Sequence, residues 1–129
     1  MYEILAAMDA YITDYSSACF EAGFAHIPVF IYADDIQKYA KDRGALMWNL
    51  ASYPRERITN NKAFTPKLNL IFPFTVANNN EQLESDIAGF NQETYNEKLN
   101  EFYKKIGLVF NGNASEKLAG EIEKKIRDI

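Results

Sequence analysis

The sequence predicts an α/β fold, namely half of a doubly wound domain with about three parallel strands and a helical C-terminal appendage. Three short runs of β-branched and aromatic residues alternate with helical patterns, whereas the last third of the chain shows only helical periodicity. Parallel strands need helices on both faces of their sheet and usually occur in larger numbers. Three strands therefore indicate part of a larger sheet. The helical pattern already present at Met1 likewise indicates the second half of a doubly wound domain.

The first third of the chain is predicted as helix, strand and helix. Residues 4–8 are typical of the last turns of a helix, and residues 10–13 of a short buried strand. A polar turn follows, and apolar, helix-forming residues begin at Ala18. Ser17 directly precedes them, so we expect it to cap the N-terminus of this helix.

A second strand and helix repeat this order. Residues 28–32 are β-branched and aromatic and predict a buried strand, after which Asp34 or Asp35 is expected to cap the next helix. The pattern is least regular from Arg43 onward. There we predict a long excursion, with an insertion or irregular segment at residues 53–70.

The remaining residues predict one more strand and then helices. Residues 74–77 form the third strand, the asparagines at 78–80 form a turn and N-cap, and Gly107 ends the middle helix in a left-handed conformation. Each helix is expected to carry one apolar face. The three faces comprise Leu83, Ile87 and Phe90; Tyr95, Leu99, Phe102, Tyr103 and Ile106; and Leu118, Ile122 and Ile126.

Composition limits the classes of protein to consider. The 129 residues provide a single domain or part of one, predicted over residues 1–129. Hydrophobic residues make up 47% and charged residues 25% of the chain, which is typical of a globular domain and excludes a disulfide scaffold. The net charge of −4 provides no basic field for a polyanion. We therefore expect no nucleic-acid partner, and any bound phosphate must be held locally.

Cysteine content and hydropathy predict a cytoplasmic location. Cys19 has no cysteine with which to form an internal disulfide, and we expect it to be a small buried hydrophobe in a reducing compartment. No apolar run approaches the roughly 18 residues of a membrane helix, and the first residues lack the basic start of a signal peptide.

The clearest candidate site lies between the first strand and the second helix, where Thr13, Asp14, Ser16 and Ser17 follow one another closely. Open α/β sheets bind ligands at the carboxyl ends of their strands. A helix N-terminus adds unpaired N–H groups and a partial positive charge, so this junction can hold a diphosphate without lysine. The alternative is that the serines only cap the helix and that Asp14 only forms the turn.

The residues around this junction carry a resemblance to a known family. The run from Leu5 to Glu21 resembles the C-terminal region of CDP-glycerol glycerophosphotransferases, the teichoic acid polymerase and primase family. Further blocks of the chain resemble successive family blocks in the same order, and only residues of about 53–70 interrupt the likeness. These blocks are residues 28–32, 39–44, 73–79 and 111–117.

The resemblance implies a fragment of a GT-B transferase, in which a Rossmann-like C-terminal domain holds the nucleotide donor. The activity it implies is transfer of glycerol phosphate from CDP-glycerol to a lipid-linked, teichoic-acid-type polymer at the cytoplasmic face of the plasma membrane. CDP-glycerol is then a donor substrate, and we expect neither a cofactor nor a metal.

The resemblance also implies substrate-binding residues. The residues after the first strand would contact the donor phosphates, with Asp14 shaping their loop, and Glu21 would contact ribose or glycerol hydroxyls. An Arg-Gly pair and a Gly-x-Ala-Ser block also match family positions. The whole set is Thr13, Asp14, Ser16, Ser17, Glu21, Arg43, Gly44, Gly112 and Ser115.

Catalytic residues are not expected in this chain. The histidines that the family is thought to use in transfer lie upstream of the matched region, and His26 is expected to have a structural role. We therefore expect the chain by itself to be inactive. Two other functions stay open: a glycosyltransferase that uses a nucleotide sugar, and a non-catalytic truncated module. The first strand is expected to be an open sheet edge through which copies of the chain pair into a homo-oligomer.

Overall fold

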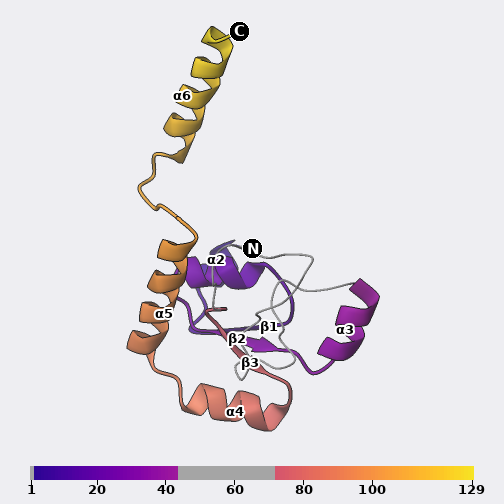
Figure 1. Cartoon of the computed structure of the whole chain (residues 1–129). Helices are drawn as coiled ribbons and strands as arrows, with labels where there is room; N and C mark the ends of the chain where they lie inside the picture. The colour runs from indigo at the N-terminus through magenta and orange to yellow at the C-terminus, as the bar shows by residue number, and fades with distance from the viewer. Residues whose placement is uncertain (1, 44–71) are drawn as a thin grey trace.

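The computed structural model describes residues 2–43 and 72–129, and Figure 1 shows their arrangement. Gly44 and the predicted insertion at residues 53–70 lie outside the described residues. The elements in chain order are α1 (Tyr2–Ala6), β1 (Tyr11–Thr13), α2 (Ala18–Phe24), β2 (Val29–Tyr32), α3 (Ile36–Arg43), β3 (Thr75–Ala77), α4 (Asn80–Ala88), α5 (Gln92–Lys105) and α6 (Ala114–Arg127).

The described strands form one parallel sheet in the order β1-β2-β3. Ile12 of β1 pairs with Phe30 of β2, and Ile31 of β2 pairs with Val76 of β3. The predicted α/β class, with three parallel strands that make up half of a Rossmann-like domain, is confirmed. In this order β1 is an edge strand, as expected, and the predicted pairing of copies through that edge stays a prediction.

The core lies between one face of the sheet and helices α2 and α5. Val29, Ile31 and Val76 point to this face because they alternate with residues of the opposite face, and each is at most 5% exposed. The Cys19 thiol of α2 is part of the same core and is 4% exposed, which confirms the sequence prediction. Burying a side chain the size of Leu99, which is 0% exposed, stabilises the fold by about 1.5–3 kcal/mol.

Helix α4 begins where the asparagine run predicts. The side chain of Asn79 accepts the amide of Gln82 at 2.9 Å, and the Gln82 side chain in turn accepts the amide of Asn78 at 2.7 Å. The predicted apolar face of α4 is only partly buried, because Ile87 is 45% exposed. Phe90, just after α4, also contacts the sheet, because its ring centroid lies 5.5 Å from that of Phe30.

Helix α5 buries the face that its periodicity predicts. Tyr95, Leu99, Phe102 and Tyr103 are all buried, and only Ile106 departs from the prediction, being 39% exposed. Ile106 is the C-cap residue, where the chain leaves the helix and turns away from the core.

Gly107 ends α5 with a φ of +71°, the left-handed conformation that was predicted. Its amide donates to the carbonyl of Lys104 at 3.2 Å, and the next amide, that of Leu108, donates to the carbonyl of Tyr103 at 3.0 Å. This pair of hydrogen bonds is a Schellman motif, which satisfies carbonyls at the helix end that have no partner within the helix.

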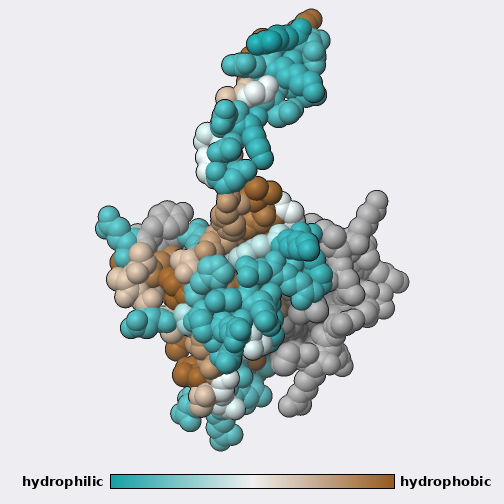
Figure 2. All heavy atoms as spheres, turned by 90° about the vertical axis from the view of Figure 1, so that its left-hand side faces the viewer, coloured by the Kyte–Doolittle hydropathy of each residue, from teal (hydrophilic) through white to brown (hydrophobic). Residues whose placement is uncertain are grey.

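Helix α6 projects from the rest of the molecule (Figures 1 and 2). It has the predicted apolar face, but Leu118, Ile122 and Ile126 are 63%, 51% and 64% exposed. The periodicity thus predicted the face, and the structure shows that it is exposed rather than packed on the core. The linker after Gly107 leads the chain away from the sheet before α6 begins.

His26 joins the turn after α2 to α5. Its ring Nδ1 lies 2.9 Å from Oδ1 of Asn96, and its carbonyl accepts from Nε2 of Gln92 at 3.1 Å. Its φ is +56°, so the turn places a non-glycine residue in the left-handed region. These contacts give His26 the structural role that was expected.

Candidate functional site

The turns that follow β1, β2 and β3 lie along one edge of the sheet, because the three strands are parallel neighbours. The first turn contains Asp14 to Ser17, the second Asp34 and Asp35, and the third the asparagines at 78–80. This is the edge at which open α/β sheets bind ligands.

A tyrosine links the first turn to the second. The hydroxyl of Tyr15 donates to Oδ1 of Asp35 at 2.8 Å, and the Tyr15 ring lies against Tyr39, with 3.9 Å between the ring centroids. Partial burial raises the pKa of Tyr15 most, and the hydrogen bond to Asp35 and the charges of Asp35, Asp34 and Asp14 raise it further. Tyr15 is therefore a fixed, protonated donor at this edge.

Two hydrogen bonds link the second turn to the third. The hydroxyl of Tyr32, the last residue of β2, donates to Oδ1 of Asn80 at 2.8 Å. The side-chain amide of Asn78 donates to the carbonyl of Ala33 at 3.0 Å. All three turns are thus held by hydrogen bonds between side chains and neighbouring turns, which gives the edge a defined shape.

The start of α2 differs from the prediction in its capping. Ser17 occupies the N-cap position, but its side chain makes no capping hydrogen bond and is exposed. Instead, Oγ of Ser16 accepts the amide of Ala18 at 3.3 Å. Ser17 has helical φ and ψ angles, whereas a capping serine normally has extended ones. This explains why the side chain of Ser16, and not that of Ser17, accepts an amide at the start of α2.

The first amides of α2 are also occupied. The amide of Cys19 donates to the carbonyl of Ser16 at 3.3 Å, and that of Phe20 donates to the carbonyl of Ser17 at 3.0 Å. These two amides are therefore not unpaired, as had been expected, and phosphate binding at this helix start stays a prediction. The groups that can still donate to a ligand include the two serine hydroxyls, because Ser16 can donate its O–H while its oxygen accepts from Ala18.

Glu21 lies one helical turn after Ser17 on the same side of α2. Its Oε2 atom is buried and has no hydrogen-bond partner among the residues that the structure describes. A buried carboxylate oxygen without a donor is costly, so Oε2 provides an acceptor that a donor group would satisfy.

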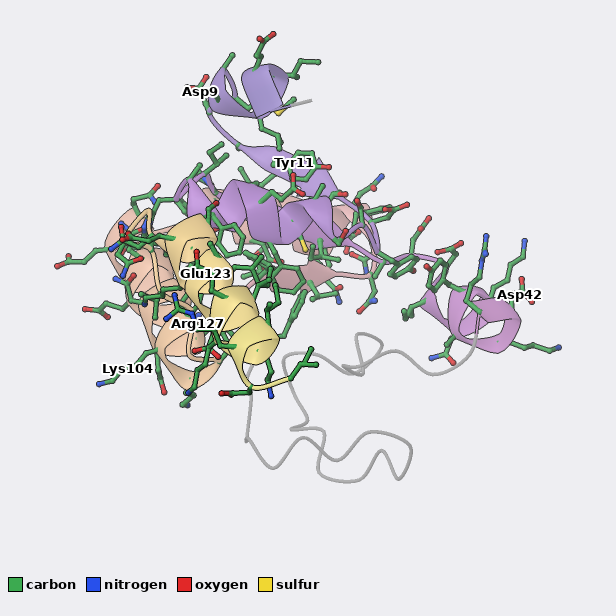
Figure 3. All side chains as sticks on the ribbon, turned by 90° about the horizontal axis from the view of Figure 1, so that it is seen from above. Asp9, Tyr11, Asp42, Lys104, Glu123 and Arg127 are labelled. Atoms are coloured by element: carbon green, nitrogen blue, oxygen red, sulfur yellow. The ribbon has the colours of Figure 1, made fainter. Side chains whose placement is uncertain are left out.

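The other predicted site residues lie apart from this junction. Arg43 is the last residue of α3 and is exposed, and its neighbour Asp42 lies on the opposite side of the molecule from α5 and α6 (Figure 3). Gly112 lies in the linker before α6 with a φ of +72°, and Ser115 lies in the first turn of α6. Both are exposed. The fold therefore brings together the junction residues and Glu21, but not Arg43, Gly112 and Ser115.

The sequence interpretation did not assign Tyr15, Tyr32, Asp35 and Asn80 to the site. Asp35 and Asn80 were considered only in connection with helix starts, although each lies in the turn region shortly after the end of a strand. Their position after predicted parallel strands is the signal that could have identified them.

The electrostatics of this edge are acidic. Asp14, Asp34 and Asp35 are exposed, and the ion pairs seen in the described part of the chain lie in α5 and α6. Carboxylates repel a phosphate, but they accept hydrogen bonds from polyol hydroxyls. The edge therefore offers hydroxyl donors at α2 and carboxylate acceptors beside them.

A separate cavity of about 290 Å³ lies at the other ends of the strands. Its lining includes Val29 and Thr75, the first residues of β2 and β3, and Asp86 and Lys98 from the helices. Burial raises the pKa of Asp86. Because it lies at the amino ends of the strands, this cavity is not part of the predicted site.

Residues 2–43 and 72–129 contain no group of three or more His, Cys, Asp or Glu side chains arranged to hold a metal ion. Among their helices, none is both long enough and apolar enough to cross a membrane.

Comparison with known proteins places these residues in context. The family model of CDP-glycerol:poly(glycerophosphate) glycerophosphotransferases matches residues 1–124. A teichoic acid poly(glycerol phosphate) polymerase of Staphylococcus epidermidis is 32% identical over 127 residues, which is 98% of this chain and 15% of that protein. A teichoic acid ribitol-phosphate primase of Bacillus spizizenii is 40% identical over 43 residues, which is 33% of this chain and 11% of that protein. The chain thus spans a small part of the length of these relatives, and no solved structure shows a significant match.

Proposed function

The chain belongs to the CDP-glycerol:poly(glycerophosphate) glycerophosphotransferase family, and we propose that it supplies part of the donor site of a transferase in teichoic acid synthesis. The proposed donor is CDP-glycerol, and the proposed acceptor is a lipid-linked polymer at the cytoplasmic face of the plasma membrane. Both relatives named above are enzymes of teichoic acid synthesis, which supports this class of reaction.

The hydroxyls of Ser16 and Ser17 are the observation that carries the proposal. They lie at the carboxyl end of β1, and the Ser17 hydroxyl is exposed and takes no part in capping α2. Together with Thr13, they donate hydrogen bonds to oxygens of the donor diphosphate. Hydrogen bonds to a charged phosphate are stronger than those between neutral groups, so the site holds a diphosphate without a lysine.

Acidic residues beside the serines would bind the ribose and glycerol hydroxyls of the donor. The buried Oε2 of Glu21 accepts a hydrogen bond from a ribose or glycerol hydroxyl, and Asp14 shapes the loop between β1 and α2. Arg43, Gly44, Gly112 and Ser115 remain candidates for substrate binding only on their family resemblance.

The proposed reaction is displacement at the β-phosphorus of CDP-glycerol. A bond forms from an acceptor hydroxyl oxygen to this phosphorus, and the bond from the phosphorus to the bridging oxygen breaks. CMP leaves with the bridging oxygen, and the proton of the acceptor hydroxyl passes to a base outside this chain. Hydrogen bonds from the two serines stabilise the charge that develops on the phosphate oxygens. The chain supplies no proposed base, so we expect it to release no CMP from CDP-glycerol by itself.

The test measures binding by NMR, because a partial site binds its ligand weakly. Addition of CDP-glycerol is expected to shift the amide signals of residues 13–21, and the variant Ser16→Ala/Ser17→Ala is expected to raise Kd at least about tenfold. Ser85→Ala, an exposed serine on α4, is the matched control and should leave Kd unchanged.

Two results would overturn the proposal. Signals of residues 13–21 that do not respond to CDP-glycerol would remove the donor site, as would an unchanged Kd in the double-serine variant. A nucleotide sugar such as UDP-glucose serves as the comparison ligand. Tighter binding of the sugar nucleotide would favour a glycosyltransferase over a glycerophosphotransferase.

A further inference from the structure

The turn between β1 and α2 carries the two serines of the proposed donor site, and both of its ends are fixed. Thr13 at its start pairs with Ile31 of β2, and Ala18 at its end is buried as the first residue of α2. The residues between these points, 14–17, belong to neither element. What holds these four residues decides where the serine hydroxyls lie.

The side chains of the two serines do not fix the turn by themselves. Oγ of Ser16 accepts the amide of Ala18 at 3.3 Å, which is long for such a hydrogen bond, and the Ser17 side chain makes no capping hydrogen bond. Neither side chain ties the turn to the next strand or its loop. The position of each serine oxygen therefore depends on how firmly the backbone of the turn is held.

Tyr15 attaches this turn to the next one at two points. Its hydroxyl donates to Oδ1 of Asp35 at 2.8 Å, and its ring lies against that of Tyr39, with 3.9 Å between the centroids. Asp35 and Tyr39 are themselves joined at the start of α3, where the Tyr39 amide donates to the Asp35 carbonyl at 3.0 Å. Tyr15 thus contacts both ends of one helical turn.

The bond from Tyr15 to Asp35 is the hydrogen bond that links residues 14–17 to a neighbouring turn in the part of the chain that the structure describes. Its acceptor is a carboxylate, and hydrogen bonds to charged groups are stronger than those between neutral groups. Tyr15 directly precedes Ser16, and the planar peptide units between them transmit a displacement of one to the other. Loss of this bond should therefore displace both serines.

We propose that Tyr15 is a positioning residue, whose hydrogen bond to Asp35 holds the turn between β1 and α2 so that both serine hydroxyls face the donor diphosphate. This inference rests on the proposed donor site and adds a residue that the family resemblance did not assign. Tyr15 itself touches no reacting atom. A site binds its ligand in proportion to the population of its binding-competent conformation, so loss of the link raises Kd.

The test compares two tyrosine hydroxyls of the same sheet edge. Tyr15→Phe removes the bond to Asp35 and keeps the ring. Tyr32→Phe is the matched control, because it removes a bond of the same length, 2.8 Å, that joins the second turn to the third. In NMR titrations with CDP-glycerol, Tyr15→Phe is expected to raise Kd about fivefold and Tyr32→Phe less than about twofold. An unchanged Kd in Tyr15→Phe, or equal effects of the two variants, would overturn the positioning role without contradicting the donor site.

Substitutions of Asp35 separate the hydrogen bond from the charge. Asp35→Asn and Asp35→Ala remove the same negative charge, but only asparagine keeps an oxygen that accepts from Tyr15. The Kd of Asp35→Ala is therefore expected to exceed that of Asp35→Asn about fivefold, and adding Tyr15→Phe to Asp35→Ala should raise it no further. Equal Kd values in the alanine and asparagine variants would overturn the proposal. Far-ultraviolet circular dichroism checks that each variant is folded.

A measurement without ligand distinguishes failure of this proposal from failure of the donor site. In the free chain, nitrogen-15 relaxation should give residues 14–17 order parameters near the rigid value of about 0.85. Tyr15→Phe should lower them, whereas Tyr32→Phe should not. If the wild-type chain does not bind CDP-glycerol, the donor site fails, but lowered order parameters in Tyr15→Phe would still support the hold of Tyr15 on the turn. Unchanged order parameters in Tyr15→Phe would overturn it.

Discussion

Helices α5 and α6 have the same length and a similar amphipathic pattern, yet only α5 packs on the core. Each has 14 residues, an asparagine at the N-cap position, apolar residues on one side and an ion pair four residues apart. The apolar side of α5 is buried against the sheet and α2, whereas α6 has no buried residue. Amphipathic periodicity thus identifies a face that needs a partner, but not the partner.

The linkers before the two helices explain the difference. Helix α5 follows α4 after a short turn at residues 89–91, so the chain re-enters along the sheet. Before α6, Gly107 and the residues after it turn the chain away from the sheet (Figure 1). The length and direction of the two linkers thus decide which helix places its apolar face on the core.

Truncating one leucine in each helix should give the largest difference in the free energy of unfolding between α5 and α6. Leu99→Ala leaves a cavity beneath α5 and is expected to lower the free energy of unfolding by about 2–5 kcal/mol. Leu118→Ala in α6 is expected to change it by no more than about 0.5 kcal/mol, because Leu118 is 63% exposed. Urea denaturation at low chain concentration measures both values. Equal effects would show that α6 packs on the core.

Glycine substitutions should give the next contrast. A Cβ atom at Gly23 would lie 2.8 Å from the hydroxyl of Tyr103 and 3.1 Å from Phe74, so Gly23→Ala is expected to lower the free energy of unfolding by about 1–3 kcal/mol. Gly120 of α6 has no atom within 4 Å of that position, and Gly120→Ala is expected to stabilise the helix by about 0.5–1 kcal/mol. Thermal denaturation should show shifts of Tm with opposite sign.

The Tyr103 hydroxyl provides a check on this explanation. It is buried without a hydrogen-bond partner among the described residues, so Tyr103→Phe alone should be neutral or stabilising. In the background of Gly23→Ala, Tyr103→Phe should recover part of the lost stability, because it removes the atom nearest to the new methyl group. No recovery would place the strain at Phe74 instead.

The N-caps should give a smaller contrast. The Asn91 side chain accepts the amide of Thr94 at 2.9 Å, and Asn91→Ala is expected to lower the free energy of unfolding by about 0.5–2 kcal/mol. The Asn113 side chain makes no capping hydrogen bond to α6, so Asn113→Ala is expected to have almost no effect. Chemical denaturation of the two variants measures both changes in the free energy of unfolding. A similar loss of stability in both variants would contradict the assigned caps.

The thiol of Cys19 should give an effect on stability that depends on pH. Burial beneath α5 raises the pKa of Cys19 to about 11, so the folded state favours the neutral thiol. This contribution is complete below the pKa of the unfolded thiol, near pH 8.5, and is lost as pH rises toward 11, because the unfolded state then binds fewer protons. Unfolding at pH 8 and pH 10 should show a smaller loss in Cys19→Ala than in the wild type.

The rate of thiol alkylation should also differ between the buried core and the exposed face of α6. At pH 8, Cys19 should react with iodoacetamide only when the core opens, whereas the exposed thiol of a Leu118→Cys variant should react at the rate of a free cysteine. Fast alkylation of native Cys19 would contradict its position in the core.

The candidate site was predicted in part. The position of Ser16 and Ser17 after the first strand located the junction, because the carboxyl ends of parallel strands and helix starts follow from local sequence. The exchange of capping roles between the two serines was not predicted, because it depends on the φ and ψ angles of Ser17. The hydrogen bond from Tyr15 to Asp35 was not predicted either, since it joins residues 20 positions apart.

The sequence by itself determined the order of strands and helices, the asparagine cap of α4, the buried face of α5 and its glycine terminus. Each of these depends on residues within one or two turns of one another, where propensity and periodicity act. Only the tertiary structure decided that α5 is buried and α6 exposed, and that the turns of three strands share one edge. Burial depends on which other surfaces the chain brings to a face, and local sequence does not specify that.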